Sequence, residues 1–104
     1  MNKIEYLLST LAEEANEIGL ASSKCNRFGL EHNPFTIENK LLSNIEHLIF
    51  EVNDVYAILE MLQEDGVITG EIINRDMIIA KKIKLTKMMK ISQDLGTLSL
   101  DVLL

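Results

Sequence analysis

The stretch LIFEVNDVYAILEML, residues 48–62, decides the fold because it is apolar on nearly every face of a helix. A helix with apolar side chains around its circumference is buried on several sides, so other helices must cover it. Two acids, Glu51 and Asp54, interrupt this apolar surface, and residues three apart on a helix share one face. Because uncompensated charge is costly to bury, an acidic pair in this setting indicates a bound cation.

A second acidic pair, Glu14 and Glu17, lies in an earlier run that has helical periodicity. The apolar side chains of this run recur at intervals of three and four residues, in a stripe near Ile4, Leu11 and Ile18. On a helical projection Glu14 lies at the flank of this stripe and Glu17 lies further round. Two helices that bring these pairs together would place four carboxylates around one point.

Three helices separated by two turns organise the chain. Their expected bounds are about Lys3 to Cys25 or Arg27, a Thr36 N-cap to about Glu64, and Glu71 to about Ser92. Glycines and the single proline mark the turns, because glycine suits a left-handed helix cap and proline disfavours helix in the residue before it. Gly96 marks the end of the third helix, and residues 93–104 form an apolar tail.

The pattern predicts an all-α fold, a helical bundle of three main helices per chain. With 104 residues, the chain is expected to form one domain, residues 1–104. Three short helices cannot cover the second helix completely, so we expect oligomerisation to complete a four-helix-type core. A homodimer or homotetramer would place the second helix at the interface, and the tail at 93–104 is expected to take part in assembly.

Composition and charge narrow the class of protein. The net charge of −6 argues against a surface that binds nucleic acid polymers. The single cysteine, Cys25, is expected in the core or reflects a reducing compartment. No signal peptide and no apolar stretch long enough for a membrane span is recognised, so a cytoplasmic protein is expected, in the host cytoplasm if a phage encodes it.

The four carboxylates Glu14, Glu17, Glu51 and Asp54 are the expected metal ligands and catalytic groups. Oxygen ligands of this kind suit Mg²⁺, with Mn²⁺ as a substitute, and such ions let an acidic site accept a triphosphate. Taken alone, Glu14 and Glu17 are better read as a solvated helix face, as is Glu13; the matched pair on the apolar helix favours the metal site. His47, one turn before Glu51, is either a further ligand or a packed or solvated residue.

Positive and aromatic side chains near the end of the first helix are expected to meet a substrate. Lys24 and Arg27 could neutralise phosphates, and Phe28 could stack on a base, although a place in the core is the simpler account of this ring. A further series recurs every three residues on the third helix, at Lys81, Lys84, Lys87 and Lys90. A basic solvated face is the favoured interpretation of this series.

The two acidic motifs resemble those of the all-α nucleotide pyrophosphohydrolase superfamily, the MazG-like proteins. LAEEANEI, residues 11–18, matches the Glu-x-x-Glu helix of that family, and EVNDVYAILEML, residues 51–62, matches its Glu-x-x-Asp helix. Residues 23–30 are similar to the short, phage-type members. The resemblance implies a Mg²⁺-dependent enzyme that hydrolyses a nucleoside triphosphate to the monophosphate and pyrophosphate, and that works as a dimer or tetramer.

Two other classes fit parts of the pattern. In a non-enzymatic helical interaction module, a protein partner would supply the missing core area and the acids would be surface groups. A ferritin-like di-metal protein requires Glu-x-x-His pairs on facing helices, and neither motif here ends in histidine.

Overall fold

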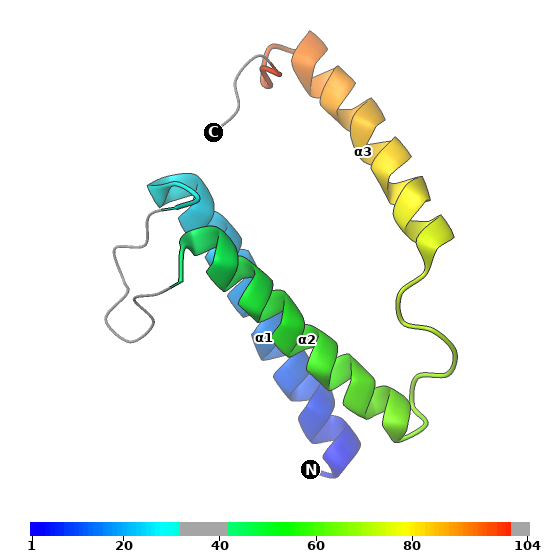
Figure 1. The fold of residues 1–104 in the computed structure, drawn as a ribbon. Helices are drawn as coiled ribbons and strands as arrows, with labels where there is room; N and C mark the ends of the chain where they lie inside the picture. Colours follow the sequence, from blue (N-terminus) through cyan, green and yellow to red (C-terminus); the bar gives the residue numbers. More distant parts are fainter. Residues whose placement is uncertain (32–41, 101–104) are drawn as a thin grey trace. The chain divides into compact units, whose positions relative to one another are not determined.

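The computed structural model describes residues 1–31 and 42–100. It contains three α-helices, α1 (Lys3–Phe28), α2 (Asn44–Glu64) and α3 (Arg75–Asp94), and no strand within the described residues (Figure 1). The all-α fold class is therefore confirmed. The chain divides into two compact units, residues 1–70 and 71–104, each of which is described by itself.

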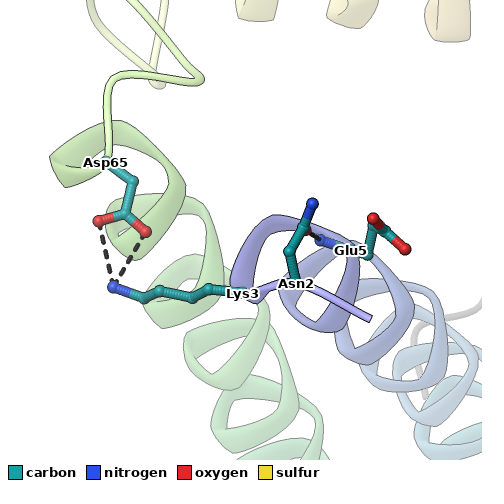
Figure 2. A network of polar contacts seen from close by, with 4 residues as sticks. All are labelled: Asn2, Lys3, Glu5 and Asp65. Atoms are coloured by element: carbon teal, nitrogen blue, oxygen red, sulfur yellow. Dashed lines mark hydrogen bonds and ion pairs between the residues drawn. The ribbon is translucent and has the colours of Figure 1, made fainter.

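Local capping fixes the bounds of α1. The side chain of Asn2 accepts a hydrogen bond of 2.8 Å from the backbone N–H of Glu5, which satisfies a donor of the first turn (Figure 2). At the other end Gly29 adopts a φ of 92° and donates its N–H to the carbonyl of Cys25. Glycine takes this conformation without the strain that a Cβ atom would add. The helix ends at Phe28, close to the predicted end at Arg27.

Helix α2 begins later than the sequence predicted. Ser43 accepts a hydrogen bond from the N–H of Glu46, and the Glu46 carboxylate accepts one from the N–H of Ser43, a capping box. Leu42 and Ser43 are not helical, so a continuous helix from Thr36 is wrong at these residues. Thr36 itself lies outside the described residues.

Helices α1 and α2 form an antiparallel hairpin that is fastened at both ends (Figure 1). At one end the Lys3 ammonium lies 3.0 Å from a carboxylate oxygen of Asp65 (Figure 2). At the other end Asn44 Nδ2 donates to the carbonyl of Gly29 over 2.8 Å, and the N–H of Ile45 donates to the carbonyl of Leu30 over 3.0 Å. These contacts fix which residues of the two helices lie opposite one another.

The buried seam between the helices follows a seven-residue spacing, which is two helical turns. On α1 and α2 the buried residues include Leu7, Ala21, Cys25, Asn44, Glu51, Ile58 and Leu62. An apolar cluster of Leu7, Ile58 and Leu62 fills one end of the seam, with Leu11 and Ile68 packed against it. Cys25 is confirmed as a core residue.

The predicted apolar stripe of α1 forms one side of the observed seam. Leu11 packs against the buried cluster, and Cys25, seven residues after Ile18, is buried, although Ile4 at the start of the helix is 40% exposed. Leu7 and Ala21 are buried as well, and the position midway between them in the seven-residue spacing is Glu14. The seam is therefore wider than the predicted stripe and includes Glu14, which the sequence placed on the flank of the stripe.

Much apolar surface stays exposed outside the seam. On α2 the exposed large apolar side chains are Ile49, Phe50, Val52 and Met61. Helix α3 has no buried residue, and it begins at Arg75 rather than at Glu71 because Asn74 caps it by accepting from the N–H of Met77. No helix in the described part of the chain is long and apolar enough to cross a bilayer.

Candidate metal centre

Three carboxylates converge in the α1–α2 hairpin. Glu14 of α1 and both Glu51 and Asp54 of α2 each offer an oxygen atom, and these atoms all lie within 4.8 Å of one another. Glu51 is 8% exposed, and the other two acids are half-buried. The structure thus brings together three of the four acids that the sequence singled out.

The convergence follows from the helical spacing. Glu14 takes the seam position between Leu7 and Ala21, and Glu51 takes the corresponding position between Asn44 and Ile58. In an antiparallel pair fastened at both ends, the two middle positions face each other. Asp54 lies one turn after Glu51 and therefore shares its face.

Burial and the neighbouring acids both affect the pKa of Glu14. Partial burial raises the pKa of its carboxyl group, and the neighbouring charges of Asp54, Glu51 and Glu17 raise it further. A side-chain hydrogen bond with Glu51 acts in the same direction. Two carboxyl groups can form such a bond only when one carries a proton. Each of these causes favours the neutral carboxyl group over the charged one, and a bound cation would act in the opposite direction.

His47 contacts the buried acid from the previous turn of α2. Its Nε2 atom lies 3.1 Å from Oε1 of Glu51, and the two side chains are 26% and 11% exposed. The imidazole also packs against the ring of Phe50, with centroids 6.4 Å apart and planes at 54°. His47 is half-buried and does not belong to the group of three acids, and its role as a further ligand stays a prediction.

Glu17 is exposed and lies outside the group of three. It is close enough to contribute to the raised pKa of Glu14. Glu17 lies three residues after Glu14, which explains its proximity to the cluster, but its side chain is exposed to solvent. Its role as a metal ligand stays a prediction. Glu13 is exposed, as expected for a control position on the same helix.

The expected substrate-binding residues lie toward the end of α1. Lys24 is half-buried, and ten residues of helix separate it from Glu14, about 15 Å along the axis. The guanidinium of Arg27 lies 4.9 Å from the centroid of the Phe28 ring, the geometry of a cation–π contact. One face of the ring is thus covered by Arg27, and base stacking by Phe28 stays a prediction.

The donor set suits a hard divalent cation. Carboxylate oxygens are the ligands that Mg²⁺ and Mn²⁺ prefer, and clustered charge that is poorly solvated is relieved when such an ion binds. An ion held here would neutralise phosphate charge and lower the pKa of a water molecule. The three carboxylates therefore have the chemistry to hold such an ion.

Sequence reasoning missed Asn44, a polar residue that is 1% exposed in the seam. Its Nδ2 group is bonded to Gly29, while its Oδ1 atom has no hydrogen-bond partner among the described residues. The signal was present in the sequence, because Asn44, Glu51 and Ile58 are spaced by seven. That spacing becomes informative once one member is known to be buried.

Comparison with known proteins identifies no relative of this chain. No family model matches the chain, and neither the curated proteins nor the solved structures contain a match to it.

Proposed function

We propose that this chain is a Mg²⁺-dependent nucleoside triphosphate pyrophosphohydrolase that releases a nucleoside monophosphate and pyrophosphate. The observation that carries the proposal is the convergence of Glu14, Glu51 and Asp54 within 4.8 Å in a partly buried seam. A structural role does not account for three acids that repel one another there. The two acidic motifs that resemble those of MazG-like enzymes supply these same three residues.

The carboxylates and the basic side chains of α1 have different roles in this reaction. Glu14, Glu51 and Asp54 hold the ion, and Glu17 adds a fourth carboxylate from the neighbouring turn of α1. The bound ion supplies charge neutralisation and an acidified water, and a carboxylate of the group accepts a proton. Lys24 and Arg27 neutralise phosphate oxygens beyond the reach of the ion.

The direct test is an assay of pyrophosphate release from a panel of standard and modified nucleoside triphosphates, with Mg²⁺, with Mn²⁺ and with a chelator. We expect release that requires a divalent cation. A parallel thermal melt should show a higher midpoint with Mg²⁺ or Mn²⁺, because a ligand that binds only the folded chain stabilises it. No release from any triphosphate would end the enzyme proposal.

A second candidate function, a helical interaction module, is favoured by the exposed apolar side chains of α2 and α3. Ile49 of α2 and Met77 of α3 are 55% and 71% exposed, and large side chains of this kind are usually covered by a partner. An inert module would show the same thermal midpoint with and without divalent cations. The melt therefore separates the two candidates before any substrate is known.

A further inference from the structure

We infer that His47 is a positioning residue, which holds the carboxylate of Glu51 in the orientation that receives the ion. This inference rests on the proposed function, because it concerns the same acidic group. The contact that carries it is the 3.1 Å separation between His47 Nε2 and Glu51 Oε1.

The Glu51 side chain contacts His47 and the Glu14 carboxyl group. The side chain is 11% exposed, so little water is available to replace the contact with His47. His47 precedes Glu51 by four residues, so helix α2 itself places the two side chains on one face. The tilted packing of the imidazole against Phe50 limits rotation of the ring.

An orienting donor is needed because the neighbours of Glu51 are acids. Repulsion from Glu14 and Asp54 would turn a free carboxylate away from the cluster. A nitrogen that donates to Oε1 opposes that rotation and leaves the second oxygen of Glu51 for the ion. Ligating carboxylates in metal sites are commonly hydrogen-bonded from behind in this way.

The role needs a donor at Nε2 and does not need a change of charge. A neutral imidazole that carries its proton on Nε2 donates as a protonated one does. His47 therefore needs only an N–H group that donates to Oε1 of Glu51. An amide side chain of suitable length can supply the same donor. Glutamine places its Nε2 group near the position of the histidine Nε2 atom.

The experiment compares wild type, His47→Phe and His47→Gln in the full chain at one pH. Phenylalanine keeps a ring against Phe50 without a donor, and glutamine keeps the donor without the ring. Mn²⁺ affinity is measured from the free-ion signal in electron paramagnetic resonance, and metal-free denaturation curves verify folding. We expect His47→Phe to bind Mn²⁺ about 10–100-fold more weakly than wild type, and His47→Gln to recover most of that loss.

The outcomes separate this inference from the proposed function. Wild type that binds no Mn²⁺ would overturn both. Wild type that binds Mn²⁺ while His47→Phe binds it equally well or more tightly would overturn the positioning role alone. A His47→Gln variant as weak as His47→Phe would also overturn it, because the ring rather than the donor would then matter. Should His47→Phe fail to fold, His47→Leu provides the same comparison.

Discussion

Glu51 is a carboxylate at a position where the spacing of α2 places a buried residue. Its neighbours in the seven-residue series are Asn44 and Ile58, and both are buried. Replacing the charged side chain of Glu51 by a neutral one should raise the metal-free free energy of unfolding, since a buried charge beside like charges is unfavourable. Catalysis and stability are therefore expected to respond in opposite directions to the same substitution.

We predict that Glu51→Gln and Asp54→Asn each abolish pyrophosphate release and leave the metal-free free energy of unfolding unchanged or higher. Both amides keep the size of the side chain and remove a repelling charge. The measurement pairs Mg²⁺-dependent pyrophosphate release with metal-free chemical denaturation. Glu13→Gln, an exposed acid on α1, is the control and should change neither quantity.

A structural role for these acids predicts instead that the amide variants are less stable than wild type. If they held the hairpin together through buried ion pairs, removing one charge would strand its partner and cost about 3–5 kcal/mol. Full activity in both amide variants would show that the ion, if bound, sits elsewhere.

The raised pKa of Glu14 gives a pH dependence with a definite sign. Because its folded-state pKa lies above the unfolded value, the folded chain binds more protons in the interval between the two. The metal-free free energy of unfolding should therefore rise as pH falls through the folded pKa, and this gain should be complete below the unfolded pKa of 4.5.

Glu14→Gln isolates this contribution, because other carboxyl groups titrate in the same range. The variant should exceed wild type in metal-free stability near neutral pH, and the difference should shrink as the solution becomes acidic. Denaturation curves at a series of pH values measure it. A difference that is constant with pH would mean that Glu14 does not feel the other acids.

At the scale of elements, the existence of all three helices follows from apolar periodicity, but their boundaries depend on caps. The Ser43-to-Glu46 pair is a capping box in the sequence, yet Thr36 offered an equally acceptable hydroxyl seven residues earlier. Helix propensity does not distinguish between two good N-cap residues. Tertiary contacts favour Ser43, because Asn44 and Ile45 then donate hydrogen bonds to the backbone at the end of α1.

We predict that Ser43→Ala lowers the free energy of unfolding by about 1 kcal/mol, within the usual range of about 0.5–2 kcal/mol for loss of an N-cap. The hydroxyl accepts from the N–H of Glu46 over 3.2 Å, and alanine cannot. Urea denaturation of the variant measures the loss. Ser22→Ala, on the exposed surface within α1, should be neutral or slightly stabilising, since alanine favours helix interiors.

The position of the seam on α1 cannot be predicted from that helix alone. The series Ile4, Leu11 and Ile18 is fully apolar, whereas the series that contains Leu7 and Ala21 has Glu14 in its middle. Pairing with α2 brings the second series into the seam, where Glu14 is half-buried while Glu17 stays exposed. The acids of the site could be predicted from their spacing, whereas their unequal burial could not.

At the scale of the whole molecule, the apolar surface of α2 exceeds what α1 can cover. Ile49, Val52 and Phe50 remain exposed on the hairpin although α1 occupies the seam. A second hairpin packed on these side chains would make a four-helix core. We therefore expect the chain to form a homodimer at least, with α2 at the interface.

We predict that Ile49→Asp converts this assembly to a monomer, because it places a charge on an apolar surface that is 55% exposed within one chain. Asn16→Asp, at an exposed polar position of α1 on the side away from the seam, adds the same charge outside α2 and should leave the assembly intact. Light scattering at micromolar concentration measures the molar mass of each. A monomeric wild-type chain would sink the prediction.

The acidic layer in the middle of the seam has a consequence for how the sequence can change. Substituting leucine for both Glu14 and Glu51 would place apolar side chains in the middle of the seam, and we expect the unfolding midpoint of the metal-free chain to rise. If the layer holds a catalytic ion, that change would also remove all activity. Selection for stability alone would then remove the acids. Their presence would therefore mark a trade-off in which the protein keeps destabilising residues in its core because its activity requires them.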